Sequence, residues 1–333
     1  MRSLRLPFRA SALLALAAMT LAGCGRTVAP VTSATDRAPA TALRAGMVGM
    51  DGPAPGGTSA NLFYPLDLGN HWGYGHELSV TIVPTGGPPG PVSTVRDRHE
   101  RDLVCVEPRA GRRYVVEQTS YGASLFSWVR YRQDGAGLFE ADVSIEDPPV
   151  CAGLSGHKIF DAGVLPASTG EEAWPALAAK LADPAQQAAY RAAWDRVQAR
   201  AAAVRRALEP GPTEAARGGV EPDELTRLEY PLHPGAHWVI RAHPRFESFV
   251  ERAEALDLAV GHVPAWRIRV ESEFLGQNDS VRFWYGQDGF LKLAAHFEGI
   301  ATDPSGNLIG IVVADESELL DELALRGGRF AAP

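Results

Sequence analysis

The chain has 333 residues, of which 45% are hydrophobic and 22% are charged, a balance typical of a globular protein with room for two modest domains. Its formal net charge is −8 at pH 7, and it becomes −11 without residues 1–23, which carry three arginines and no acid. A chain this acidic, with no basic cluster, is repelled by phosphate backbones. The composition therefore argues against nucleic-acid binding.

The first 23 residues have the pattern of an export signal. A basic segment precedes an apolar stretch at 11–20, which is too short to cross a hydrocarbon core of roughly 30 Å. The sequence Leu21–Cys24 follows at once and resembles the lipobox of bacterial lipoproteins. By that resemblance Cys24 becomes the lipidated first residue of a mature chain held in a membrane by its acyl anchor. An ordinary signal peptide that contains a cysteine is the alternative.

The resemblance also implies a location in the cell envelope. Gly25 follows the cysteine, in place of the aspartate associated with inner-membrane retention, so the outer membrane is expected if the source has two membranes. Residues 24–60 are rich in Ala, Pro, Gly, Thr and Ser without apolar periodicity, which predicts a disordered tether behind the lipidated cysteine.

An internal repeat organises the rest of the chain. The segment Tyr64–Trp72 recurs as Tyr230–Trp238, with Tyr, Pro, Leu, Gly, His and Trp at identical spacing, 166 positions apart. In each copy proline fixes φ, glycine permits a reversal, and the tryptophan is expected to close one end of a core. We interpret both segments as structural turns that begin a sheet.

Two further pairs share an offset of 154 positions. They are the tyrosines of a Tyr-x-x-Asp-Gly motif, Tyr131 and Tyr285, and the acids Glu117 and Glu271. A Gly/Pro loop at 84–91, present only in the first copy, accounts for the difference between the two offsets. The repeat therefore predicts a duplication.

Both copies have the alternation of β-strands with one buried face. Apolar and charged residues alternate strictly over 266–274, and residues 72–82 show another period of two. The predicted fold class is mainly β (α+β), with two tandem duplicated antiparallel curved sheets, half-barrel-like, and a helical insertion between them. The predicted domains are the signal at 1–23, the tether at 24–60, a first β domain at 61–168, a helical insertion and linker at 169–227, and a second β domain at 228–333.

Two helices are expected in these domains. Asp183 and Pro184 form a helix start, and apolar residues from Tyr190 to Leu208 recur at spacings of three and four, opposite a surface of arginines. This stripe packs on its own sheet or docks a partner. A short acidic helix is predicted at 317–325, after an apolar strand at 308–313.

The block Tyr-Pro-Leu-x-x-Gly-x-x-Trp, the turn Gly261–Trp266 and the following aromatic-Tyr-x-x-Asp-Gly are together similar to a widespread group of uncharacterised secreted bacterial lipoproteins. The resemblance covers residues 228–300 well and 62–145 more loosely. It implies curved antiparallel half-barrels, loosely like those of the lipoprotein carriers LolA and LolB. It brings no catalytic motif.

If Cys24 carries lipid, Cys105 and Cys151 remain. An even remainder in an oxidising compartment suggests a disulfide, and two buried free thiols are the equal alternative. No CxxC pair exists, so a structural zinc site is not predicted.

The histidines and the candidate nucleophile favour structural roles. Five histidines fall in two groups, one in each copy of the repeat. They occupy turns or sheet faces without an HExxH pattern, so no metal and no cofactor are predicted. They are His71, His76, His233, His237 and His243. Ser155 lies in a glycine-rich loop that is not a GxSxG motif. Glu271 and Glu273 share a strand face with arginines, which favours ion pairing over acid–base catalysis.

The tryptophans raise the question of a ligand. Trp128 and Trp284 lie close together in the repeat register, and Trp284 shares a strand face with Arg282, so these three residues are the candidate ligand groove, with packing as the favoured alternative. The first functional hypothesis is a non-catalytic envelope module, not an enzyme, that binds an apolar or amphipathic ligand or an envelope partner. The alternatives are an envelope hydrolase with a hidden site and a purely structural lipoprotein.

Overall fold

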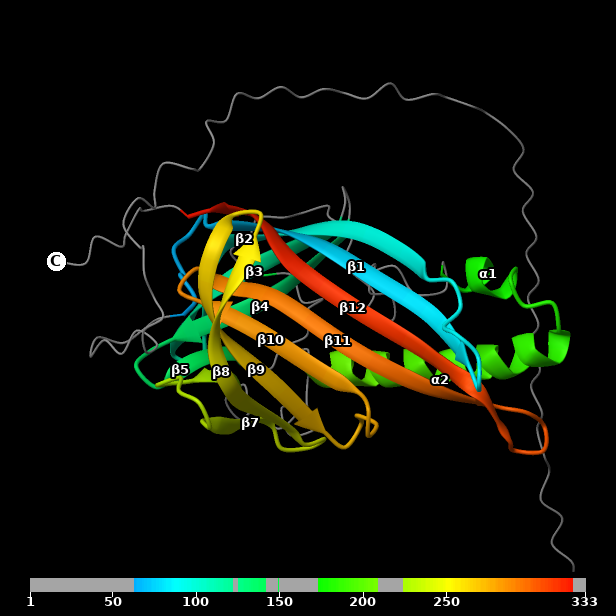
Figure 1. The fold of residues 1–333 in the computed structure, drawn as a ribbon. Helices are drawn as coiled ribbons and strands as arrows, with labels where there is room; N and C mark the ends of the chain where they lie inside the picture. The colour runs from blue at the N-terminus through cyan, green and yellow to red at the C-terminus, as the bar shows by residue number, and fades with distance from the viewer. Residues whose placement is uncertain (1–62, 122–124, 142–148, 150–172, 209–223, 326–333) are drawn as a thin grey trace, which may run out of the picture. The chain divides into compact units, whose positions relative to one another are not determined.

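The computed structural model describes residues 63–121, 125–141, 149, 173–208 and 224–325 of the chain. The predicted signal, the lipidation site and the tether lie outside these residues. The first strands are β1 (His71–Pro84), β2 (Ser93–Arg109), β3 (Arg112–Tyr121), β4 (Leu125–Gln133) and β5 (Gly137–Ala141). Two helices follow, α1 (Ala173–Ala178) and α2 (Pro184–Leu208). The remaining strands are β6 (Glu224–Glu229), β7 (His237–Arg241), β8 (Phe246–Leu258), β9 (Gly261–Ser272), β10 (Ser280–Gly286), β11 (Gly289–Thr302) and β12 (Leu308–Ala324) (Figure 1).

The strands form one twelve-stranded sheet, in the order β6-β5-β4-β3-β2-β1-β12-β11-β10-β9-β8-β7. Strand β1 pairs antiparallel with β12 along its whole length, from His71 opposite Ala324 to Pro84 opposite Gly310. The two edge strands, β6 and β7, lie beside each other, and the indole nitrogen of Trp238 donates a 3.0 Å hydrogen bond to the carbonyl oxygen of Thr226. The antiparallel sheet is therefore nearly closed on itself.

The mainly β class with a helical insertion is confirmed, but the copies do not form separate sheets. The first copy begins at β1 and the second ends at β12, and the pairing of these two strands joins the halves. Two separate sheets would leave both strands as unpaired edges, each with a row of unsatisfied backbone groups. One continuous sheet satisfies those groups.

The predicted acidic helix at 317–325 is wrong. These residues belong almost entirely to β12, where Glu316 and Glu318 are buried and Leu320 is 1% exposed. The local sequence fits both a helical period and an alternation of two, so periodicity alone does not separate helix from strand. Pairing with β1 on one side and β11 on the other decides the outcome.

The repeated turns occupy equivalent places before β1 and β7. Gly69 and Gly235 adopt φ of 83° and 85°, a conformation that favours glycine. Trp72 and Trp238 are both buried, as the turn interpretation predicts.

The pairs at the offset of 154 behave differently from each other. Tyr131 and Tyr285 line the same cavity, whereas Glu117 is 1% exposed and Glu271 is exposed. The two acids therefore differ in burial, although β3 and β9 hold corresponding places in the two halves of the strand order.

Helix α2 packs on β11 and β12 of its own sheet (Figure 1). Its predicted apolar stripe is buried, including Tyr190, Trp194 and Val197. Gly299 of β11 permits this approach, because a Cβ atom there would lie 2.6 Å from the carbonyl oxygen of Ala193. Neither described helix is long and apolar enough to cross a membrane.

The arginine surface of α2 is not simply a solvated face. Strand β10 stops pairing with β11 at Ser280, so the carbonyl groups of Glu298 and Ile300 are free to accept other hydrogen bonds. Arg200 and Arg196 donate to these two carbonyl oxygens. The helix therefore replaces a missing strand neighbour with side-chain donors.

Candidate functional site

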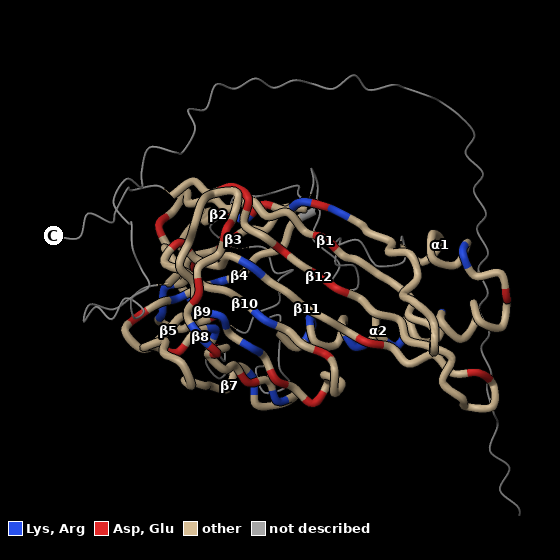
Figure 2. Tube along the Cα trace, viewed as in Figure 1, with Lys and Arg blue, Asp and Glu red and all other residues tan. Residues whose placement is uncertain are grey.

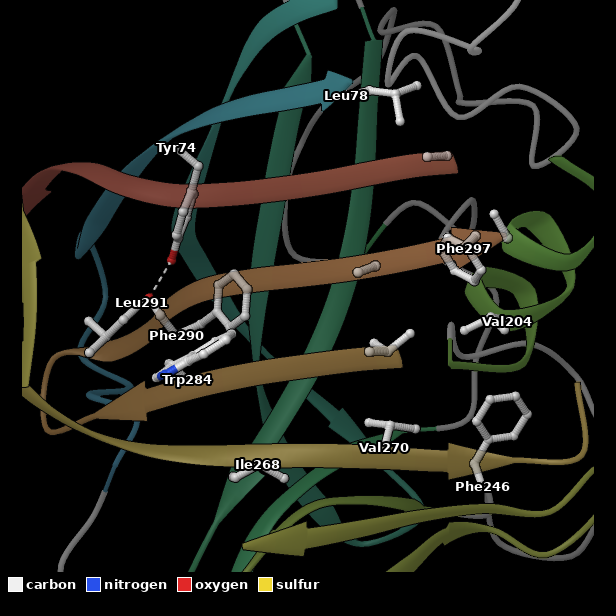
Figure 3. Close-up of a cluster of buried hydrophobic side chains, with 14 of the residues drawn as sticks. Tyr74, Leu78, Val204, Phe246, Ile268, Val270, Trp284, Phe290, Leu291 and Phe297 are labelled. Carbon is white, nitrogen blue, oxygen red and sulfur yellow. Dashed lines mark hydrogen bonds between the residues drawn. The ribbon is translucent and has the colours of Figure 1, made fainter. Parts of the chain in front are cut away.

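A cavity of about 240 Å³ lies inside the curved sheet. It is lined from β2, β4, β6 to β12 and the C-terminal half of α2, and we call the sheet face that lines it the inner face. One wall is apolar and strongly aromatic, and Figure 3 shows part of it, with Phe297 of β11 close to Val204 of α2. The main residues of this wall are Ile268, Val281, Phe283, Phe290, Leu293 and Phe297.

Charged groups also line the cavity, beginning with Arg101 of β2. Its Nη2 donates a 2.6 Å hydrogen bond to Oε1 of Glu318, and its guanidinium lies over the rings of Tyr74 and Phe290, 4.6 and 4.8 Å from their centroids. Burial disfavours the charged form of Glu318, but Arg101 and His99 outweigh burial and lower the pKa of this carboxyl to about 2. Glu318 therefore stays ionised and neutralises Arg101.

A second chain of charges links the sheet to α2. Arg205 of the helix donates a 2.7 Å hydrogen bond to Glu316, which lies 3.0 Å from Nε2 of His76, while Nδ1 of His76 lies 2.9 Å from Asp97. Burial opposes the charge of Glu316, but Arg205 and His76 lower its pKa to about 2. Burial also opposes protonation of His76, but Asp97 and Glu316 raise its pKa to about 10.

Arg227 of β6 is the third arginine of the cavity wall. Its Nε donates to Glu140 of β5, and its Nη2 donates to the carbonyl oxygen of Leu208, the last residue of α2. A cation is well placed at this helix end, since the final carbonyl groups have no intrahelical partners. Arg227 therefore holds the end of α2 against the sheet.

The inner face also buries a neutralising acid behind Arg101. Tyr64 donates to Glu117, whose carboxylate lies 3.9 Å from Nη1 of Arg101. Burial raises the pKa of Glu117, and neither Arg101 nor Tyr64 compensates fully. Its proton affinity is therefore higher than that of an exposed glutamate.

Two phenols face the cavity without a partner. The hydroxyl groups of Tyr131 and Tyr285 make no hydrogen bond to another described residue, although both side chains line the space. Nε of Arg101 is likewise buried without a hydrogen-bond partner. The two phenols are therefore unused donors among the residues that line the cavity.

The residues of the predicted groove do not come together. Trp128 of β4 is 1% exposed and donates to Gln118, while Trp284 of β10 donates to Glu254, and five strands lie between β4 and β10 in the sheet order. None of the three predicted residues lines the cavity.

Arg282 and Trp284 belong to a paired polar surface of β8, β9 and β10. Arg282 contacts Glu251, which also bonds Arg267, and the ammonium of Lys292 lies 4.8 Å from the Trp284 ring centroid. Figure 2 shows basic and acidic residues interspersed along these strands. This surface fits ion pairing and packing.

The remaining residues that the sequence singled out are cysteines, histidines and one serine. Cys105 of β2 is disulfide-bonded, whereas Cys24, Cys151 and Ser155 lie outside the described residues, so the pairing of Cys105 with Cys151 stays a prediction. His233 and His237 are exposed, and His237 stacks on Phe249. In the part of the chain that the structure describes, no group of three or more His, Cys, Asp or Glu is placed to hold a metal ion.

Sequence reasoning missed the cavity arginines. Arg101 lies more than 100 positions before Arg205 and Arg227, and the strand order together with the packing of α2 on β11 and β12 brings the three to one space. The repeated Tyr-x-x-Asp-Gly motif was a usable signal, since its two tyrosines meet at the cavity.

Comparison with known proteins identifies no family for this chain. The chain matches no protein-family model and no curated protein. A crystal structure of a proposed lipoprotein from Parabacteroides distasonis aligns with 79% of this chain and 98% of its own length, at 10% identity and a TM-score of 0.28. A proposed exported protein with a YmcC-like fold from Bacteroides fragilis aligns with 79% of this chain and 99% of its own length, at 8% identity and a TM-score of 0.29. Likenesses this distant carry no conclusion, so function must be argued from this chain's own residues.

Proposed function

We propose that this chain is a non-catalytic, lipid-anchored protein of the cell envelope whose sheet cavity binds a small apolar or amphipathic ligand. The observation that carries the proposal is the cavity of about 240 Å³ with its aromatic wall inside the nearly closed sheet. Protein interiors are close-packed, and apolar side chains at such a position normally fill the space. A retained apolar space with polar groups on one side is typical of a ligand site.

The pairing of the charged groups supports binding over catalysis. Arg101, Arg205 and Arg227 each contact a buried carboxylate, so these groups are held in ion pairs instead of converging on one point in the cavity. An acid–base or nucleophilic site needs groups within reach of one reacting atom. A hydrolase and a purely structural lipoprotein are the alternative outcomes of the tests below.

The lipid anchor and the envelope location rest on the lipobox. Leu21–Cys24 follows a short export signal, and several acyl chains on Cys24 would hold the protein firmly, where one chain binds only marginally. Globomycin, which blocks lipoprotein signal processing, should leave an unprocessed precursor, and fractionation should find the mature form in the outer membrane of a two-membraned source. Normal processing under the drug contradicts the anchor.

Duplication is the proposed origin of the sheet. The repeated turns precede β1 and β7, and each contacts a hairpin of the other half. Trp72 donates to the carbonyl oxygen of Asp288, and the backbone N–H of Tyr230 donates to the carbonyl oxygen of Ala136, 2.9 Å away. This reciprocity supports a two-fold relation between the halves.

Native mass spectrometry of the protein purified from its own envelope tests ligand binding. We expect a lipid-sized adduct, which Ala295→Phe should abolish, because Ala295 lines the cavity. Ala294→Phe is the matched control, since the neighbouring residue in β11 points to the other face. If repeated preparations give only the mass of the protein without a ligand, the purely structural alternative is favoured. Release of an acyl or glycan fragment from envelope material would favour the hydrolase.

A further inference from the structure

We propose that the cavity selects a neutral, single-chain amphiphile, whose chain lies on the aromatic wall and whose uncharged, oxygen-bearing head group binds Tyr131 and Tyr285. This inference rests on the proposed binding function and names the class of its ligand. It differs from the obvious expectation that a cavity with three arginines binds an anion.

The charges of the cavity wall are already compensated. Arg101 pairs with Glu318 at 2.6 Å and Arg205 pairs with Glu316 at 2.7 Å, while Arg227 pairs with Glu140. A bound carboxylate or phosphate would have to compete with these fixed carboxylates after losing its own hydration. Burial of a charge without a free counter-charge is strongly unfavourable.

The same balance disfavours a cationic ligand. The carboxylates of Glu316 and Glu318 are engaged by arginines, and His76 and His99 lie within 3.0 Å of them as further partners. An amine entering the cavity would therefore find no unpaired anion. The head group that costs least to bury is uncharged.

The unpaired hydroxyl donors of the cavity suit a ligand whose head group carries an acceptor oxygen. The Tyr131 and Tyr285 hydroxyl groups have no partner among the described residues, and Nε of Arg101 is also unpaired. Burial raises the pKa of Tyr285 to about 12, and burial followed by the nearby Glu140 raises the pKa of Tyr131 well above its usual value, so both phenols keep their protons. A hydroxyl, ester or amide oxygen can accept from both phenols, which donate but carry no charge.

The size of the cavity limits the ligand to one chain. Sites for drug-sized ligands occupy about 300–1,000 Å³, and this space of about 240 Å³ is smaller. Phe283, Phe290 and Phe297 line it along β10 and β11, which gives an apolar wall for one extended chain.

Titration calorimetry with three probes that share one chain length tests this selection. The probes are 1-decanol, decanoate and decylammonium, and the protein is the full exported chain carrying Cys24→Ser, which keeps the anchor's own acyl chains out of the measurement. We expect 1-decanol to bind at least about tenfold more tightly than either charged probe, a difference of about 1.4 kcal/mol.

Variants test the assigned head-group site. Tyr131→Phe with Tyr285→Phe should weaken 1-decanol binding by about tenfold, because two hydrogen bonds of roughly 0.5–1.5 kcal/mol each are lost. Tyr190→Phe is the control, since the Tyr190 hydroxyl donates to the carbonyl oxygen of Ile309 outside the cavity.

The other outcomes separate the two proposals. Tighter binding of decanoate, or equal binding of all three probes, overturns the neutral head group while leaving the binding function in place. If no probe binds to a correctly folded chain, and Ala295→Phe changes nothing, the proposed function itself fails.

Discussion

The indole nitrogen of Trp72 donates a 2.7 Å hydrogen bond to the carbonyl oxygen of Asp288, 216 positions further along the chain. Asp288 is the second residue of the turn between β10 and β11, and the next residue, Gly289, begins β11 with a φ of 106°. A Cβ atom at Gly289 would lie 3.3 Å from that same indole nitrogen. The first repeated turn is thus fixed to a hairpin of the second half, and this contact ties the two halves together.

Trp72→Ala should therefore destabilise the whole sheet. Removing a fully buried tryptophan typically costs about 3–5 kcal/mol, and Trp72 is 0% exposed. Trp72→Phe should cost less, since it retains most of the packing and loses the hydrogen bond. Urea denaturation followed by circular dichroism measures both, and equal losses for the two variants would contradict the packing argument.

The second repeated turn gives a matched pair of substitutions. Trp238 is 4% exposed and joins β7 to β6. Trp238→Ala should therefore reduce the free energy of unfolding by roughly 3–5 kcal/mol, which lowers the melting temperature sharply. The neighbouring His237 is exposed, so His237→Ala should change stability by about 0.5 kcal/mol or less. If His237→Ala instead abolished a ligand- or metal-dependent property at unchanged stability, the turn would be a binding site.

The ion pair between α2 and β12 should hold the helix against the sheet. Arg205→Ala leaves the buried Glu316 with His76 as its remaining partner, and we expect a loss of roughly 1–3 kcal/mol. Arg205→Met combined with Glu316→Gln should recover part of that loss, because no unpaired charge remains buried. A double-mutant cycle that shows no coupling would mean that the apolar stripe alone docks α2.

The His76 network predicts a decline of stability at alkaline pH. Because Asp97 and Glu316 outweigh burial and raise the pKa of His76 from 6.5 to about 10, its contribution is complete below pH 6.5 and is lost as the pH rises towards 10. Glu316 behaves oppositely, since its pKa falls from 4.5 to about 2 and its contribution is lost only as the pH falls through that range. The free energy of unfolding of the natural chain should fall between pH 6.5 and 10.

His76→Gln isolates this effect from other titrating groups. The difference in unfolding free energy between the natural chain and the variant should shrink as the pH rises towards 10. A constant difference over that range would show that His76 does not gain a proton on folding.

The disulfide prediction concerns the partner of Cys105. If Cys105 and Cys151 are bridged, mass spectrometry of the mature protein without reductant should give a mass two protons lighter than the reduced form, and peptide mapping should recover the two cysteines together. Alkylation of both thiols without prior reduction would reject this pairing.

Local pattern predicted much of the sheet. The alternation around Trp72 and that around Tyr285 each identified a strand face, because a period of two is a property of neighbouring residues. The same reasoning failed at residues 317–325, where the local pattern also fits a helix. It also assigned no partners to the arginines of α2, because the carbonyl groups that they bind belong to β11.

The sequence by itself determined the strand-rich class, the apolar stripe of α2 and the burial of Trp72 and Trp238, and it alone is the basis of the predicted export and lipidation signal. These features depend on residues close together in the chain, whose periodicity and turn chemistry act locally. Only the tertiary structure decided that β1 pairs with β12 to make one sheet and that Arg101, Tyr131 and Tyr285 surround one cavity. Strand pairing over long separations makes those contacts, and the need to satisfy backbone edges and buried charges selects among the alternatives that local pattern leaves open.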